Sequence, residues 1–310
     1  MVTSKDKFLY INNFNGLRLL AACQVMLGHA INQFHIESLF FLEHFIEIFP
    51  GVPIFFIISG FLIGLSIQKD PNLKRYFQKR FLRIYPGLAT AFFLSVFVVL
   101  IYNVDFKFYE MLIWAFTQLT VLQNYDPAFL KAFGVGKLNP PLWTIAVEIQ
   151  FYILAPMLIF LFRNYLKYVF LFFLIFVFFK EFNNYLHDLG GVYGKIFNQT
   201  FLPHFYLFII GAYLSYNTEL IRKYFFNKFH FWISVFFISN FILSYAGFEI
   251  RSNWQNFISS ILLGLAAISF AYSYTNYTAK LKMKDDLSYG MYIYHYILIN
   301  IFYHYGFVDS

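Results

Sequence analysis

Long apolar runs separated by short polar segments extend along most of the chain. A run of about 20 apolar residues is long enough for a helix to cross the hydrocarbon core of a bilayer. The pattern therefore predicts an all-α, polytopic transmembrane helical bundle of about nine or ten spans. The clear spans cover residues 12–35, 46–67, 84–102, 142–162, 166–179, 201–216, 229–247, 255–274 and 287–305.

Residues 103–141 are the ambiguous part of this pattern. The segment 108–123 is apolar, but it is short and carries Glu110, Gln118 and Gln123. Lysines and arginines gather in the cytoplasmic loops of membrane proteins, and here they segregate more cleanly if this segment does not cross. We expect nine crossings and a re-entrant or interfacial segment on the outer side, with ten crossings as the alternative.

The basic residues also predict the orientation. The segment 68–83 should be a cytoplasmic loop because it is rich in lysine and arginine. The tail 1–12 has no small-residue cleavage site and is expected to be cytoplasmic, which places the protein in the inner (plasma) membrane. We expect residues 1–310 to form a single membrane domain without an appended soluble domain. The basic residues of the loop are Lys69, Lys74, Arg75, Lys79, Arg80 and Arg83.

Composition excludes several classes of protein. The chain is 60% hydrophobic and only 13% charged, which is far more apolar than a soluble domain. Its net charge of +7 reports membrane orientation and gives no reason to expect a nucleic-acid partner. A single cysteine, Cys23, excludes a disulfide within the chain. We find no metal-ligand spacing, phosphate-binding glycine loop or G-x-S-x-G motif.

The first span carries the most informative pair of polar residues. Arg18 and His29 lie within about 20° of one helix face and roughly 16 Å apart along the axis. Ionisable residues inside a membrane are costly and usually functional. The simpler alternative is that Arg18 reaches the headgroups and His29 bonds a neighbouring helix. Their shared face favours a ligand with an anionic head and a long reactive arm.

Two further groups of polar residues flank later spans. Arg80 and Arg83 share a helix face beside Tyr85, and two guanidinium groups at a membrane surface suit phosphates. Glu148 enters the bilayer from the other side and could reach the depth of His29. A His–Glu pair would serve a general base, although pairing of Glu148 with an arginine for structural reasons has equal weight.

Four more residues are weaker candidates. Ser59 precedes Gly60, a small pair that most often permits close helix packing. Trp143 lies at interface depth at the start of the span that holds Glu148, and Tyr152 follows in the same span. His295 lies about two helical turns after Ser288, close to the same face.

Together these residues resemble the acyltransferase-3 family of integral membrane O-acyltransferases. The ordered set extends from about residue 12 to about residue 300. It comprises Arg18 and His29 in an R-x10-H spacing, FFIISGFLI, Arg80-x-x-Arg83 with Tyr85-Pro86, Pro141-Leu-Trp143 through Glu148 to Tyr152, and Leu287-Ser288-Tyr289-Gly290 with His295.

The resemblance implies transfer of an acyl group, typically acetyl from acetyl-CoA, to a carbohydrate hydroxyl on lipopolysaccharide O-antigen, capsule or exopolysaccharide. The phosphates of acetyl-CoA would bind near Arg18, Arg80, Arg83 and Tyr85. His29 would act as a general base or carry the acetyl group, Glu148 would orient His29 or the acceptor, and the acceptor would contact Trp143, Tyr152, Ser59 and His295.

A glycan or glycolipid transporter that uses the same intramembrane residues is the alternative function. Inverted internal repeats would favour it, and we find none. Expected partners are acetyl-CoA, the carbohydrate acceptor and membrane lipids, with no metal and no nucleic acid. The acceptor sugar and the oligomeric state do not follow from the sequence.

Overall fold

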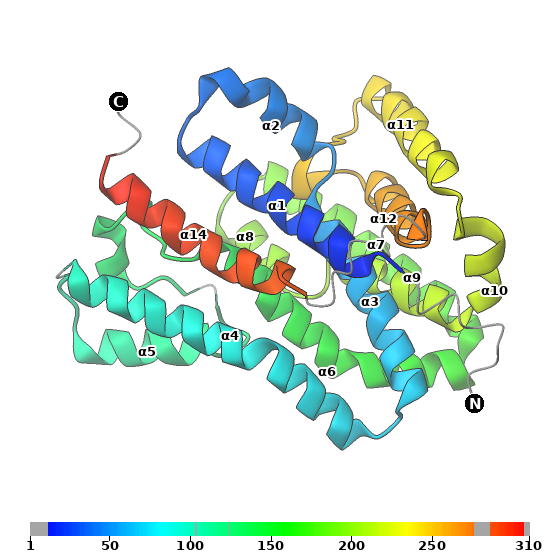
Figure 1. Cartoon of the computed structure of the whole chain (residues 1–310), viewed down its shortest axis with the longest axis horizontal. Helices are drawn as coiled ribbons and strands as arrows, with labels where there is room; N and C mark the ends of the chain where they lie inside the picture. The colour runs from blue at the N-terminus through cyan, green and yellow to red at the C-terminus, as the bar shows by residue number, and fades with distance from the viewer. Residues whose placement is uncertain (1–11, 103, 124, 276–285, 307–310) are drawn as a thin grey trace.

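The structure is a bundle of helices (Figure 1). It is a computed structural model that describes residues 12–102, 104–123, 125–275 and 286–306, so most of the predicted tail 1–12 lies outside the described residues. None of the described residues forms a strand, which confirms the all-α fold class. The helices are α1 (Phe14–Gln33), α2 (Phe40–Glu47), α3 (Gly51–Lys69), α4 (Leu73–Ile101), α5 (Phe108–Gln118), α6 (Trp143–Asn164), α7 (Leu166–Asp188), α8 (Val192–Asn198), α9 (Phe205–Tyr216), α10 (Thr218–Leu220), α11 (Phe229–Tyr245), α12 (Phe257–Ala271) and α14 (Ser288–His304).

Several described helices are long and apolar enough to cross a bilayer. Length and composition identify four such segments, or five if the bent pair Thr218–Phe225 and Phe229–Tyr245, which meet at 78°, counts as one span. These helices support a multi-pass membrane protein, while the total of nine or ten spans stays a prediction. The four segments are Glu37–Lys69, Leu73–Ile101, Pro140–Asn164 and Leu166–Asp188.

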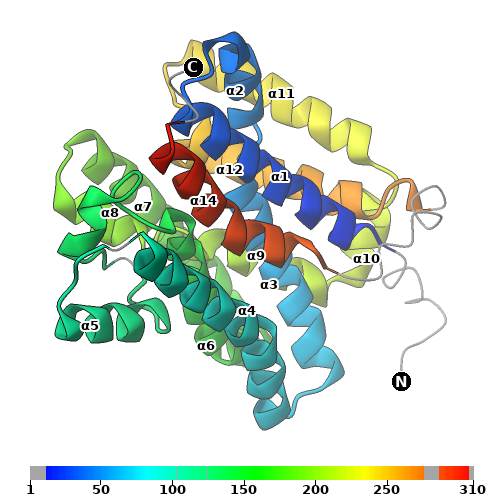
Figure 2. The same cartoon turned by 60° about the vertical axis from the view of Figure 1, so that its left-hand side comes forward.

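Helices α1 and α14 run parallel and side by side through the centre of the bundle (Figures 1 and 2). Contacts join them in the same order along both helices. Arg18 binds Asp286 just before α14, Cys23 meets Met291, His29 meets His295, and Gln33 accepts a hydrogen bond from Tyr296. Parallel helices cross a bilayer in the same direction, so a chain that uses both as its first and last spans crosses an odd number of times.

In the chain, helix α5 connects α4 to α6, and these two helices run in opposite directions. Near the start of α4, the Tyr76 hydroxyl donates to the carbonyl of Tyr152, which lies well along α6. The end of α4 and the start of α6 therefore lie at the same end of the bundle. Helix α5 packs on α4 through Phe92 and Trp114, and its 11 residues are too few to span a bilayer. This arrangement fits a re-entrant or interfacial segment.

The basic segment 68–83 differs in conformation from the expected loop. Asn72 caps α4 by accepting a hydrogen bond from the backbone N–H of Arg75 at 3.0 Å, so the chain is helical from Leu73 onward. Most of this connection between two spans is thus helical, and its cytoplasmic location stays a prediction. The helical conformation gives Arg80 and Arg83 fixed directions.

Helix α3 forms the centre of the packed core and is buried along most of its length. Its glycines allow α9 to approach very closely. A Cβ atom at Gly60 would lie 2.2 Å from the carbonyl oxygen of Phe208, and one at Gly211 would lie 2.0 Å from that of Ile57. Close packing is therefore the role of Gly60, and it holds Ser59 and Val52 on a rigid helix beside the site described next.

Candidate active site

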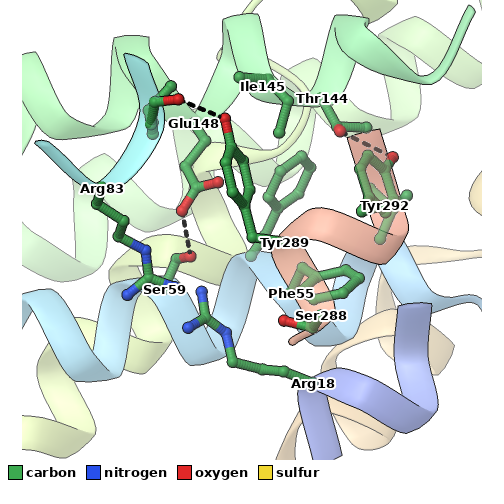
Figure 3. A pocket seen from close by; sticks show the side chains of 13 residues that line it. Arg18, Phe55, Ser59, Arg83, Thr144, Ile145, Glu148, Ser288, Tyr289 and Tyr292 are labelled. Carbon is green, nitrogen blue, oxygen red and sulfur yellow. Dashed lines mark hydrogen bonds between the residues drawn. The ribbon is translucent and has the colours of Figure 1, made fainter. Parts of the chain in front are cut away.

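Two cavities meet inside the bundle between α1, α3, α6 and α14. We name them after the polar residues that distinguish them. The arginine cavity has about 510 Å³ of empty space, including the part open to the surroundings, and is lined by Arg18, Val52, Phe55, Phe56, Ser59, Arg83, Ile84, Thr144, Ile145, Glu148, Ser288, Tyr289 and Tyr292 (Figure 3). The histidine cavity has about 710 Å³ by the same measure and is lined by Gln24, Val25, Gly28, His29, Asn32, Glu43, Glu47, Pro50, Gly51, Val52, Pro141, Trp143, Ser252, Asn253 and Tyr292.

In the arginine cavity, two guanidinium groups hold one carboxylate. Nη1 of Arg18 lies 2.6 Å and Nη2 of Arg83 lies 2.9 Å from the same oxygen, Oδ2 of Asp286. Arg18 is only 6% exposed, and its Nε–H has no hydrogen-bond partner among the described residues. Figure 3 shows both guanidinium groups pointing toward each other and toward Ser59 and Glu148. The pair is thus arranged to hold an anion.

Asp286 lies just before α14 and has several partners. Its other carboxylate oxygen accepts hydrogen bonds from the hydroxyl and the backbone N–H of Ser288. Burial raises the pKa of this carboxyl, but Arg18, Ser288 and Arg83 together outweigh burial and hold the pKa below its usual range. The carboxylate is therefore ionised at neutral pH and neutralises part of the arginine pair.

Glu148 belongs to the arginine cavity and does not pair with His29. Its Oε1 accepts hydrogen bonds from the hydroxyl of Ser59, at 3.2 Å, and from the hydroxyl of Tyr152. The expected His29–Glu148 pair is thus wrong. Glu148 lies on the part of α6 that faces the arginine end, and a different residue occupies the position beside His29.

That residue is His295 of α14. Nδ1 of His29 lies 2.9 Å from Nε2 of His295, and the two rings are nearly parallel. Nδ1 of His295 faces the carbonyl oxygens of Tyr292, at 2.8 Å, and Met291, at 3.1 Å. Carbonyl oxygens only accept hydrogen bonds, so Nδ1 of His295 carries the proton and its Nε2 is the acceptor.

This chain of hydrogen bonds determines the tautomer of His29. Because Nε2 of His295 accepts, Nδ1–H of neutral His29 must donate, and Nε2 of His29 is left with a lone pair. No hydrogen bond from another described residue reaches that nitrogen. His29 lines the histidine cavity, so the lone pair is available to take a proton from a molecule bound there.

The histidine cavity has a polar wall opposite the imidazole pair. Glu43 and Glu47 of α2 line it, and Asn32 donates to Glu43 at 3.3 Å. Trp143 at the start of α6 adds an aromatic side chain. Ser252 and Asn253 contribute from the connection between α11 and α12. Such a mixture of carboxylates, amides and one tryptophan can bind a molecule with many hydroxyl groups.

Four of the predicted site residues line neither cavity: His295, which binds His29 from behind the cavity wall, and Arg80, Tyr85 and Tyr152. The guanidinium carbon of Arg80 lies 5.8 Å from the ring centroid of Tyr76 and 5.5 Å from that of Tyr152. Tyr152 is buried and donates to Glu148, which leaves its hydroxyl occupied. Tyr85 stacks on Phe81 with ring centroids 4.4 Å apart. Arg80 and Arg83 are three positions apart along α4, and only Arg83 lines the cavity.

Sequence reasoning missed the central roles of Asp286 and Tyr292. Asp286 precedes α14 and bridges both arginines. The signal that could have found it is charge, because Arg83 enters the apolar layer and needs a partner. Nothing in the sequence pattern distinguishes Tyr292 from the other tyrosines around it. Among the described residues, no cluster of three or more His, Cys, Asp or Glu side chains could hold a metal ion.

Comparison with known proteins identifies the family of the chain. Residues 11–309 match the family model of an acyltransferase domain, so the chain belongs to the acyltransferase-3 family and is a membrane O-acyltransferase. The chain is also 29% identical over 312 residues to Nodulation protein 10 of Rhizobium leguminosarum bv. viciae, which covers 93% of this chain and 83% of that protein. No solved structure matches the chain. The resemblance stated from the motifs is thereby confirmed.

Proposed function

We propose that this enzyme transfers an acetyl group from acetyl-CoA to a hydroxyl of a cell-surface or exported carbohydrate. The observation that carries the proposal is the meeting of two cavities with different chemistry. One ends at an arginine pair suited to phosphate, and the other contains a histidine with an available lone pair. The distance along α1 between Arg18 and His29, roughly 16 Å, suits a donor with a long arm.

Acetyl-CoA would bind with its phosphates at Arg18 and Arg83. These two side chains already hold a carboxylate oxygen between them, and guanidinium groups bind phosphate oxygens with the same bidentate geometry. The arm would extend through the arginine cavity past Ser59 and Glu148 toward the junction of the cavities. The arginine end would face the cytoplasm, where the basic residues of 68–83 also belong by the positive-inside rule.

The acceptor would enter the histidine cavity from the other side of the membrane. Its hydroxyl oxygen attacks the thioester carbon while Nε2 of His29 takes the hydroxyl proton. The C–S bond then breaks, the proton on His29 passes to the CoA sulfur, and the products are an acetyl ester and free CoA. His295 keeps the lone pair of His29 on the correct nitrogen, and Trp143, Asn32 and the two glutamates of α2 would bind the sugar.

The proposal is tested by the ester content of surface and secreted glycans. We would compare cells that produce the wild type, His29→Ala or His44→Ala at matched membrane levels, using mass spectrometry. His44 is a suitable control because it is exposed and binds only a carbonyl of its own helix. Loss of acetyl esters with His29→Ala but not with His44→Ala is expected. Equal acetylation in all three would contradict the mechanism, and glycan movement without CoA release would indicate a transporter.

A further inference from the structure

The two cavities share only two lining residues, Val52 of α3 and Tyr292 of α14. Both residues are 5% exposed, and we call this pair, which borders both cavities, the neck. The arginine pair lines the cavity on one side of the neck and His29 lines the cavity on the other. A reacting group that reaches from one cavity toward the other comes to lie against Val52 and Tyr292.

The Tyr292 side of the neck is held in place by its neighbours. The hydroxyl of Thr144 donates to the hydroxyl of Tyr292 at 2.8 Å, and the Tyr292 hydroxyl lies 3.4 Å from the carbonyl oxygen of Pro141. Phe55 packs edge-on against the Tyr292 ring, with centroids 5.7 Å apart. Figure 3 shows the Thr144 contact and Phe55 beside the ring. The ring therefore has little freedom to swing away.

The Val52 side is equally constrained. The backbone N–H of Gly51 donates to Oε1 of Gln24 at 2.8 Å. A Cβ atom at Gly51 would lie 2.6 Å from the carbonyl oxygen of Ala21, so the start of α3 is in direct contact with α1. The backbone that carries Val52 cannot move toward α1 to widen the neck. Close packing of this kind resists even one added methylene group.

We propose that Val52 and Tyr292 bind the acyl group itself and restrict the enzyme to acetyl. The inference rests on the proposed function and specifies which acyl group the donor carries. The arm of the donor fills the arginine cavity and the acceptor fills the histidine cavity. The substituent on the thioester carbonyl is therefore left with the space at the neck. A longer acyl group has to displace Val52, Tyr292 or the acceptor.

The test is competition between acyl donors on one enzyme. Purified protein in lipid nanodiscs receives equal concentrations of acetyl-CoA, propionyl-CoA and butyryl-CoA together with glycan from cells that lack the enzyme. Mass spectrometry then gives the ratio of the esters. A ratio measured within one reaction does not depend on how much of a variant is folded. Wild type should prefer acetyl over propionyl by about 10-fold or more, the usual discrimination for one methylene.

Val52→Ala removes two methyl groups from the neck and should lower that preference about 10-fold. Val99→Ala is the matched control, because Val99 is a buried valine of α4 that lines neither cavity, so the same substitution there should leave the ratio unchanged. Tyr292→Phe removes the hydroxyl contacts but keeps the ring, so it should relax the preference less than Val52→Ala. If Val52→Ala yields no product, the ratio of acetyl to propionyl esters made by Tyr292→Phe tests the size filter instead.

Two results would overturn the neck as a size filter. One is equal use of acetyl-CoA and propionyl-CoA by the wild type. The other is an unchanged ester ratio in a neck variant that still transfers acyl groups. Absence of any acyl transfer by the folded wild type from all three donors would instead contradict the proposed function. The two hypotheses can therefore fail separately.

Discussion

The arginine cavity and the histidine cavity differ in how their polar groups are satisfied. In the first, opposite charges meet, and Asp286 already occupies the two guanidinium groups that a phosphate would need. In the second, two neutral rings share one hydrogen bond, and a lone pair remains without a partner in the described part of the chain. Charge in one cavity and an available lone pair in the other suggest a division of work between binding the donor and moving a proton.

The largest expected effect tests whether His29 moves a proton, and it comes from removing His295, the partner of His29. His295→Ala should lower kcat by about 10²-fold because Nδ1 of His29 loses its acceptor and the lone pair no longer stays on Nε2. His295→Gln, whose amide oxygen can accept the same bond, should restore part of the activity. Steady-state kinetics and the pH profile of kcat check this. Equal loss in both variants with an unchanged pH profile would indicate a packing role only.

The second prediction separates two arginines that look equivalent in the sequence. Arg83→Ala should raise the KM for acetyl-CoA at least about 10-fold, because a charge-assisted hydrogen bond to phosphate is lost. Arg80→Ala should change that KM less than about threefold, since Arg80 packs on Tyr76 and Tyr152 outside the cavity. Initial rates at varied acetyl-CoA measure both. A larger effect at Arg80 would place the phosphates elsewhere.

The third prediction concerns the carboxylate that occupies the arginine pair. Asp286→Asn leaves two like charges side by side and should lower the free energy of unfolding by about 1–3 kcal/mol, less than for a fully buried pair because Asp286 is partly exposed. Added CoA should raise the melting temperature of the variant more than that of the wild type, because phosphate supplies the missing charge. Thermal unfolding in detergent with and without CoA checks this, and Asp70→Asn at the exposed pair with Lys79 is the control.

The smallest expected effect is on acid stability. The folded pKa of Asp286 is lowered, so its contribution to stability is present above the unfolded pKa of about 3.9 and is lost as the pH falls through the folded value. The difference in melting temperature between the wild type and Asp286→Asn should therefore shrink as the pH is lowered from about 5 to about 3. A constant difference over that range would show that the charge of Asp286 does not stabilise the fold.

The sequence alone was sufficient for the class of fold and for the residues of α1. Apolar periodicity depends on neighbours in the chain, so it predicts where helices form and which residues are out of place in lipid. Arg18 and His29 were found in this way, and their shared face on α1 agrees with their positions in adjoining cavities. Arg83, Ser59, Trp143 and His295 were also singled out from the sequence, and all four lie at the site.

Only the tertiary structure decided which of these residues meet. His29 pairs with His295 instead of Glu148, Asp286 joins two arginines far from it in the chain, and Arg80 packs on Tyr152 outside the arginine cavity. These outcomes depend on the parallel packing of α1 against α14 and on the glycine contacts that bring α3 against α9. Helical periodicity defines the faces of each helix, but the crossing and register of helices distant in sequence come from packing, which no local pattern encodes.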